Sequence, residues 1–154
     1  MRERLTEALK EAMKAKDQRK VSTLRLILAA IKEKDIAARS QDRCEGASEE
    51  EILGVLAKMV KQRQESSQTY EEAGRLDLAE QEREEMEIIQ SFLPRQLHGE
   101  EVREACNAVI AELDASGLKD MGRCMGELKA RYAGRMDFRE ASAIVRQLLA
   151  GRAA

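Results

Sequence analysis

Apolar residues recur every three to four positions along most of the chain, the spacing of α-helices that bury one face. In the first half of the sequence this pattern predicts four helices, over residues 2–16, 19–39, 48–73 and 77–93. In the second half it predicts three shorter helices, over residues 100–115, 119–132 and 137–149. A single proline with nine glycines argues against an architecture of strands and turns, so the predicted fold class is all-α.

The only proline, Pro94, lies between these two sets of helices. Proline removes a backbone donor and clashes with the preceding turn, so it stops or kinks a helix. Its neighbours Phe92, Leu93 and Leu97 are too apolar for a free linker, which indicates a packed corner. We therefore predict an N-terminal four-helix bundle over residues 1–96 and a C-terminal three-helix bundle over residues 97–154.

Several helix ends carry recognisable signals. Asp17 is a predicted N-cap, and Gly74 is a predicted C-terminal stop. Three pairs have the spacing of a capping box, in which each side chain bonds the backbone of the other residue. These pairs are Ser48 with Glu51, Asp77 with Glu80, and Asp137 with Glu140.

The charge is balanced overall but uneven along the chain. The net charge is -2, and aromatic residues make up only 3% of the sequence, so an aliphatic core is expected. Residues 1–43 hold twelve Lys and Arg against seven Asp and Glu, and residues 119–139 hold six against three. Residues 65–87 hold nine acids against two bases. This unevenness allows local electrostatic recognition, while solvated helix faces explain it equally well.

No complete catalytic group is found in the sequence. The single histidine, His98, is expected at the surface or at a helix start, without a nucleophile placed to pair with it. The periodicity puts Glu82 among the inward positions of its helix, yet Glu82 and Glu85 as a pair are interpreted as a solvated face rather than metal ligands. We predict no catalytic residue, no metal site and no cofactor.

The cysteines and the hydropathy bear on location. Cys44, Cys106 and Cys124 are odd in number and widely spaced, which favours reduced thiols in a cytoplasmic protein. Cys106 and Cys124 fall on apolar helix faces and are expected in the core. No run of residues is long and apolar enough for a membrane span, and no membrane partner is expected.

Two groups of basic residues are candidates for binding. One surrounds the first predicted turn and consists of Lys14, Lys16, Arg19, Lys20 and Arg25. The other consists of Lys119, Arg123, Lys129, Arg131, Arg135 and Arg139. Either group could bind RNA phosphates by shape and charge, and in the second group positions 135 and 139 bracket a helix start whose amides could hold an anion. No aromatic residues are interleaved with them, so base stacking is not indicated.

Several short stretches together carry a family resemblance. They are Ser22-Thr23-Leu24-Arg25, Lys61-Gln62-Arg63 with Ser66, Ala73-Gly74-Arg75, Glu82 with Glu85, Phe92-Leu93-Pro94-Arg95-Gln96-Leu97, and Lys119-Asp120-Met121-Gly122. In order and spacing the sequence resembles the YqeY-like proteins over nearly its whole length. It departs from the family pattern at His98-Gly99, where a serine usually starts the helix, and at Phe138, where a small residue is usual.

The resemblance implies a four-helix bundle followed by a three-helix bundle. It also implies kinship with the tail of GatB, a subunit of the tRNA-dependent amidotransferase, and in that enzyme the tail is associated with gripping tRNA. The implied partners are tRNA and an amidotransferase or synthetase subunit. Three functions stay open: a non-catalytic tRNA-associated module, a protein-interaction adaptor, and a component of a carbon–nitrogen ligase that takes glutamine as amido-nitrogen donor.

Overall fold

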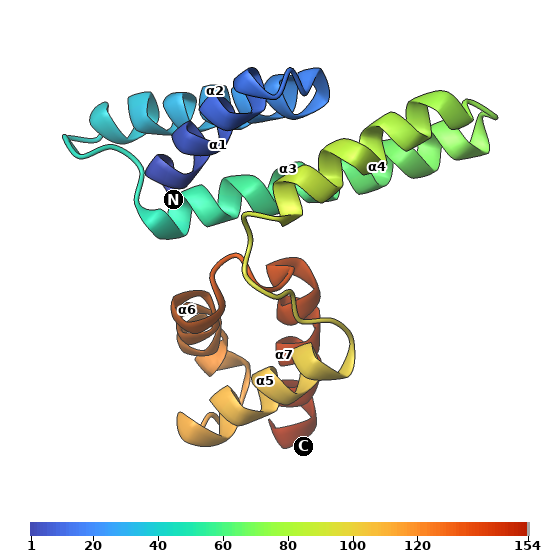
Figure 1. Ribbon diagram of the computed structural model, residues 1–154. Helices are drawn as coiled ribbons and strands as arrows, with labels where there is room; N and C mark the ends of the chain where they lie inside the picture. Colours follow the sequence, from blue (N-terminus) through green and yellow to red (C-terminus); the bar gives the residue numbers. More distant parts are fainter. Residues whose placement is uncertain (154) are drawn as a thin grey trace. The chain divides into compact units, whose positions relative to one another are not determined.

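The computed structural model describes residues 1–153, and over that range all of the regular secondary structure is helical (Figure 1). The α-helices are α1 (Arg2–Lys14), α2 (Gln18–Arg39), α3 (Glu49–Glu72), α4 (Leu76–Gln90), α5 (Glu100–Glu112), α6 (Met121–Tyr132) and α7 (Phe138–Ala153), with a 3-10 turn η1 (Leu118–Asp120) before α6. The predicted all-α class is confirmed. The chain folds as two compact units, unit 1 from Met1 to Pro94 and unit 2 from Arg95 onward.

Unit 1 is built from two helical hairpins. Helix α1 packs along α2, α3 packs along α4, and α2 also contacts both α3 and α4 (Figure 1). The core between them is almost wholly aliphatic, as the composition predicts. Its largest fully buried side chains are Leu5, Leu24, Ile27, Ile52, Leu56 and Ile89.

The turns of unit 1 follow the sequence signals except at α4. Asp17 caps α2, and Ser48 with Glu51 forms the predicted capping box of α3. Gly74 adopts a φ of 76°, a left-handed conformation that closes the end of α3. The capping box predicted for Asp77 is wrong, because α4 already begins at Leu76. Asp77 lies in the first helical turn, where a backbone hydrogen bond lowers the pKa of its carboxyl group.

A clasp around Asp35 fixes the loop between α2 and α3. The Arg2 guanidinium donates to both carboxylate oxygens of Asp35, at 2.8 and 2.6 Å, and to the carbonyl of Ala47 at 3.0 Å. The Ala47 amide donates to Asp35 at 2.8 Å. These bonds hold the pKa of Asp35 far below its usual range. Gly46 passes so close that a Cβ there would lie 2.6 Å from an Asp35 oxygen.

Unit 2 packs α5, α6 and α7 around an aliphatic core that also contains two thiols. Cys106 and Cys124 are fully buried, as predicted, and burial raises the pKa of Cys106 to about 11. The segment after Pro94 docks against the α6–α7 turn, where the Leu97 amide donates to the Arg135 carbonyl at 2.7 Å. His98 is exposed at the start of α5, as expected. Over the residues described, none of the helices combines the length and apolarity needed to cross a membrane.

Candidate functional site

Arg131, one of the six basic residues predicted as binding candidates in unit 2, is held in ion pairs. Its Nε lies 2.7 Å from Glu127 on its own helix, and its Nη2 lies 2.5 Å from Glu112 on α5. These two carboxylates raise the pKa of the guanidinium further above its ordinary value. Arg131 therefore joins α6 to α5, and its charge is compensated within the fold.

Arg123 and Arg135 are also used by the structure. Arg123 donates to the carbonyl of Leu113 at 2.9 Å, and Asp120 lies 3.4 Å away. Arg135 donates to the carbonyl of Arg95 at 3.2 Å, and its guanidinium lies 5.6 Å from the centre of the Tyr132 ring. Both arginines thus brace loops of unit 2, although their outer surfaces stay accessible.

The other three predicted residues, Lys119, Lys129 and Arg139, are exposed and form no ion pair within residues 1–153. Lys129 of α6 and Arg139 of α7 line one hollow of about 430 Å³. Its remaining lining residues are Met125, Phe138 and Ser142, and we call this the α6–α7 hollow.

Two expectations concern this region. An aromatic ring does accompany the basic residues, because Phe138 lines the α6–α7 hollow while packing against the core. At the start of α7, the Asp137 carboxylate already accepts the backbone amide of Arg139 at 2.9 Å. One amide at the helix start between positions 135 and 139 is therefore already bonded to an acid, and the expectation that the amides there hold an anion stays a prediction.

The first basic group, around the α1–α2 turn, is divided in a similar way. Arg19 extends to α4, where it lies 3.3 Å from Glu84 and 3.9 Å from Glu85. The other members, Lys14, Lys16, Lys20 and Arg25, form no ion pair over the described part of the chain. Arg19 thus pairs with two acids of α4 that lie within the acidic segment 65–87.

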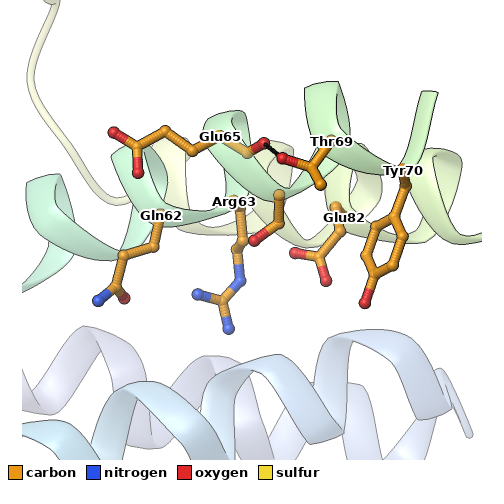
Figure 2. A pocket seen from close by; sticks show the side chains of 7 residues that line it. Gln62, Arg63, Glu65, Thr69, Tyr70 and Glu82 are labelled. Atoms are coloured by element: carbon orange, nitrogen blue, oxygen red, sulfur yellow. Dashed lines mark hydrogen bonds between the residues drawn. The ribbon is translucent and has the colours of Figure 1, made fainter. Parts of the chain in front are cut away.

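A larger hollow, of about 710 Å³, lies along α3 and α4 in unit 1 (Figure 2). We call it the α3–α4 hollow, and its lining residues are Gln62, Arg63, Glu65, Ser66, Thr69, Tyr70 and Glu82. In Figure 2 the side chains of Gln62, Arg63, Tyr70 and Glu82 all extend toward the same side. Gln62, Arg63, Ser66 and Glu82 are among the residues that carry the family resemblance.

A shielded ion pair borders this hollow. The Nε of Arg63 lies 3.0 Å from Glu85, and the two side chains are only 13% and 12% exposed. Arg63 also donates to the carbonyl of Met59 at 3.3 Å. The second oxygen of Glu85 lies 3.9 Å from Arg19, so a single carboxylate links α4 to both α3 and α2.

Glu82 is the exception in this network. It is half-buried and has no hydrogen bond or ion pair among the residues described. Burial raises the pKa of its carboxyl group, the negative charge of Glu85 adds to the increase, and Arg63 opposes it. The interpretation of Glu82 and Glu85 as a solvated face is therefore wrong. The useful signal in the sequence was the helical spacing that put Glu82 at an inward position.

The residues described form a small all-helical protein with two hollows lined by charged and polar side chains. No group of three or more potential metal-ligating side chains assembles within residues 1–153. The chain belongs to the YqeY-like protein family, whose model matches residues 2–149.

Similar proteins from three organisms carry the name altered inheritance of mitochondria protein 41, mitochondrial. The one from Clavispora lusitaniae is 36% identical over 110 residues, which are 70% of this chain and 61% of that protein. Those from Eremothecium gossypii and Vanderwaltozyma polyspora are 38% and 37% identical over 89 residues, which are 58% of this chain and 46% of each protein. The matched region thus spans about half the length of these relatives. Their name places them in mitochondria, so a cytoplasmic location stays a prediction for this chain.

Proposed function

We propose that this protein is a non-catalytic, tRNA-associated module related to the GatB tail, and that unit 2 contacts the RNA backbone. In this proposal residues 1–96 act as a four-helix module and residues 97–154 as a three-helix, GatB-tail-like module. The amide-transfer chemistry of a glutamine-dependent carbon–nitrogen ligase would belong to a partner. Membership of the YqeY-like family supports the proposal.

One observation carries it: two uncompensated cations converge on the α6–α7 hollow. Lys129 and Arg139 come from different helices, and Ser142 adds a hydroxyl group at the same place. Phosphate oxygens are acceptors for all three side chains, and contacts of this kind supply most of the affinity of RNA-backbone binding. The edge of Phe138 offers an apolar surface for a sugar or a base.

We infer a ranking of the six basic residues from their contacts within the fold. Lys119, Lys129 and Arg139 are available to a ligand, whereas Arg131 is neutralised by its two carboxylates. Arg123 and Arg135 keep loops in place, so their replacement would test folding as well as binding. The proposed contact set is therefore Lys119, Lys129 and Arg139.

The test is a tRNA gel shift between 50 and 300 mM salt with Lys129→Glu, Arg139→Glu and the double variant. The control is Arg146→Glu, which makes the same charge change at an exposed site on α7 outside the hollow. We expect the wild-type affinity to fall steeply with salt, and the double variant to reduce the slope of log K against log salt by about 2. Undetectable binding at 50 mM salt, or equal weakening by Arg146→Glu, would contradict the proposal.

The second candidate function is a protein-interaction adaptor for an amidotransferase or synthetase subunit. It is favoured by the acidic hairpin of α3 and α4, where residues 65–87 carry nine acids against two bases. A pull-down with and without nuclease separates the two functions. A protein partner that stays bound after nuclease treatment supports the adaptor, and loss of all partners together with the RNA supports the tRNA module.

A further inference from the structure

The lining of the α3–α4 hollow determines what kind of ligand it can take. None of its seven lining residues is aliphatic, and the one aromatic residue, Tyr70, carries a hydroxyl group. A ligand in this hollow would exchange water for hydrogen bonds and ion pairs, with little gain from apolar burial. The hollow is therefore suited to a polar or charged group.

The charges that remain uncompensated in the hollow are negative. Arg63 is the only cation in the lining, and it already binds Glu85 and the Met59 carbonyl. Glu82 has no hydrogen bond or ion pair within residues 1–153, and neither has the side chain of Glu65. A cation would thus meet an unmatched carboxylate, whereas an anion would meet an arginine that is already paired.

Glu82 and Tyr70 both line the hollow, and in Figure 2 their side chains extend toward the same side. The neutral groups around them, which include Gln62, Ser66 and Thr69, all offer oxygen acceptors. An ammonium group has three donors and no acceptor, which matches one carboxylate flanked by neutral oxygens. The ring of Tyr70 can add a cation–π contact.

We propose that the α3–α4 hollow binds a primary ammonium group, with Glu82 as its counter-ion. The ammonium group belongs either to a free diamine or to a lysine side chain of a partner protein. The excess of acids in residues 65–87 would attract either source electrostatically. Burial and Glu85 raise the pKa of Glu82, so a bound cation would relieve the cost of keeping this carboxylate ionised.

The experiment is isothermal titration calorimetry of the full chain at pH 7 and 50 mM salt, with two probes. One probe is 1,5-diaminopentane, and the other is an acetylated trilysine peptide, with the same peptide acetylated on its side chains as a blank. The test variant is Glu82→Gln, which keeps the shape and removes the charge. The matched control is Glu80→Gln, which removes a charge from an exposed site on α4 outside the hollow. Circular dichroism verifies that both variants keep the wild-type helix content.

We expect Glu82→Gln to weaken binding by about tenfold or more, and Glu80→Gln to change it by less than about twofold. Binding of the diamine identifies a free amine, and binding of the peptide alone identifies a lysine of a partner; either result supports the proposal. Equal weakening by the two variants would show that only the general acidity of the hairpin matters, and this would overturn it. So would the absence of binding of both probes at millimolar concentration.

Discussion

The Arg63–Glu85 pair offers a sharp stability test, because removing either partner should have a different cost. Arg63→Met leaves Glu85 with only the more distant Arg19 and takes from Glu82 the cation that lowers its pKa. Glu85→Gln leaves Arg63 its bond to the Met59 carbonyl and an amide oxygen to donate to. It also removes a negative charge that disfavours ionised Glu82. Arg63→Met should therefore be the more damaging change.

The magnitudes follow from the shielding of the pair. Two unit charges about 4 Å apart attract by about 4 kcal/mol at an effective dielectric constant of about 20. Breaking a buried ion pair by removing one member typically lowers the free energy of unfolding by about 3–5 kcal/mol. For Arg63→Met we expect about 3 kcal/mol, because Glu85 keeps its contact with Arg19. Loss of the Glu85 charge with its hydrogen bond retained should cost about 1 kcal/mol.

Hydrogen exchange followed by mass spectrometry measures this effect where it arises. We expect Arg63→Met to lower the protection of α3 and α4 amides by about a hundredfold, while amides of α5 and α7 act as an internal reference. The control is Arg83→Met, which breaks an ion pair with Glu71 on the same hairpin. The two charged groups lie 2.9 Å apart, and both side chains are about half exposed. Its cost should stay below about 1 kcal/mol. Equal costs for Arg63→Met and Arg83→Met, or a larger cost for Glu85→Gln, would refute the reasoning.

Three further outcomes are expected. Gly46→Ala should destabilise unit 1 more than Gly74→Ala in thermal unfolding, since both positions need a positive φ but only at Gly46 would the new Cβ collide with Asp35. Acid should destabilise unit 1 progressively, because the folded-state pKa values of Asp35 and Glu51 are depressed, that of Glu51 to about 2. The stability that these two carboxylates contribute is complete above about pH 5 and is lost as the pH falls toward 2. Circular dichroism at decreasing pH measures this loss. A thiol reagent should modify Cys44 rapidly in the folded chain and the two core cysteines only on unfolding, as counted by mass spectrometry.

The helices could be predicted because their signals are local. Apolar spacing, the caps at Asp17 and Ser48, and the stop at Gly74 each depend on residues within one or two turns of one another. The Asp77 prediction failed within the same range, because a carboxylate in the first turn of a helix looks the same in sequence as one that caps it.

The charge state of the candidate surfaces could be predicted only in part, because charge compensation is a long-range property. Arg131 looks available in the sequence, and its neutralisation by Glu112 depends on how α5 packs against α6. Likewise, Arg63 and Glu85 are 22 positions apart and meet only because the α3–α4 hairpin brings them together. The number of basic residues in the sequence therefore overestimates how many uncompensated cations unit 2 presents. The number of acidic residues likewise does not reveal that Glu82 lacks an ion-pair partner within residues 1–153.

The hairpin arrangement of unit 1 also bears on how the protein folds. Most of its helix packing joins neighbours along the chain, α1 with α2 and α3 with α4. Small domains dominated by such short-range pairing cross their folding barrier in microseconds to milliseconds. On a ribosome that adds about 5–20 residues per second, each hairpin would have time to form before the next one is synthesised.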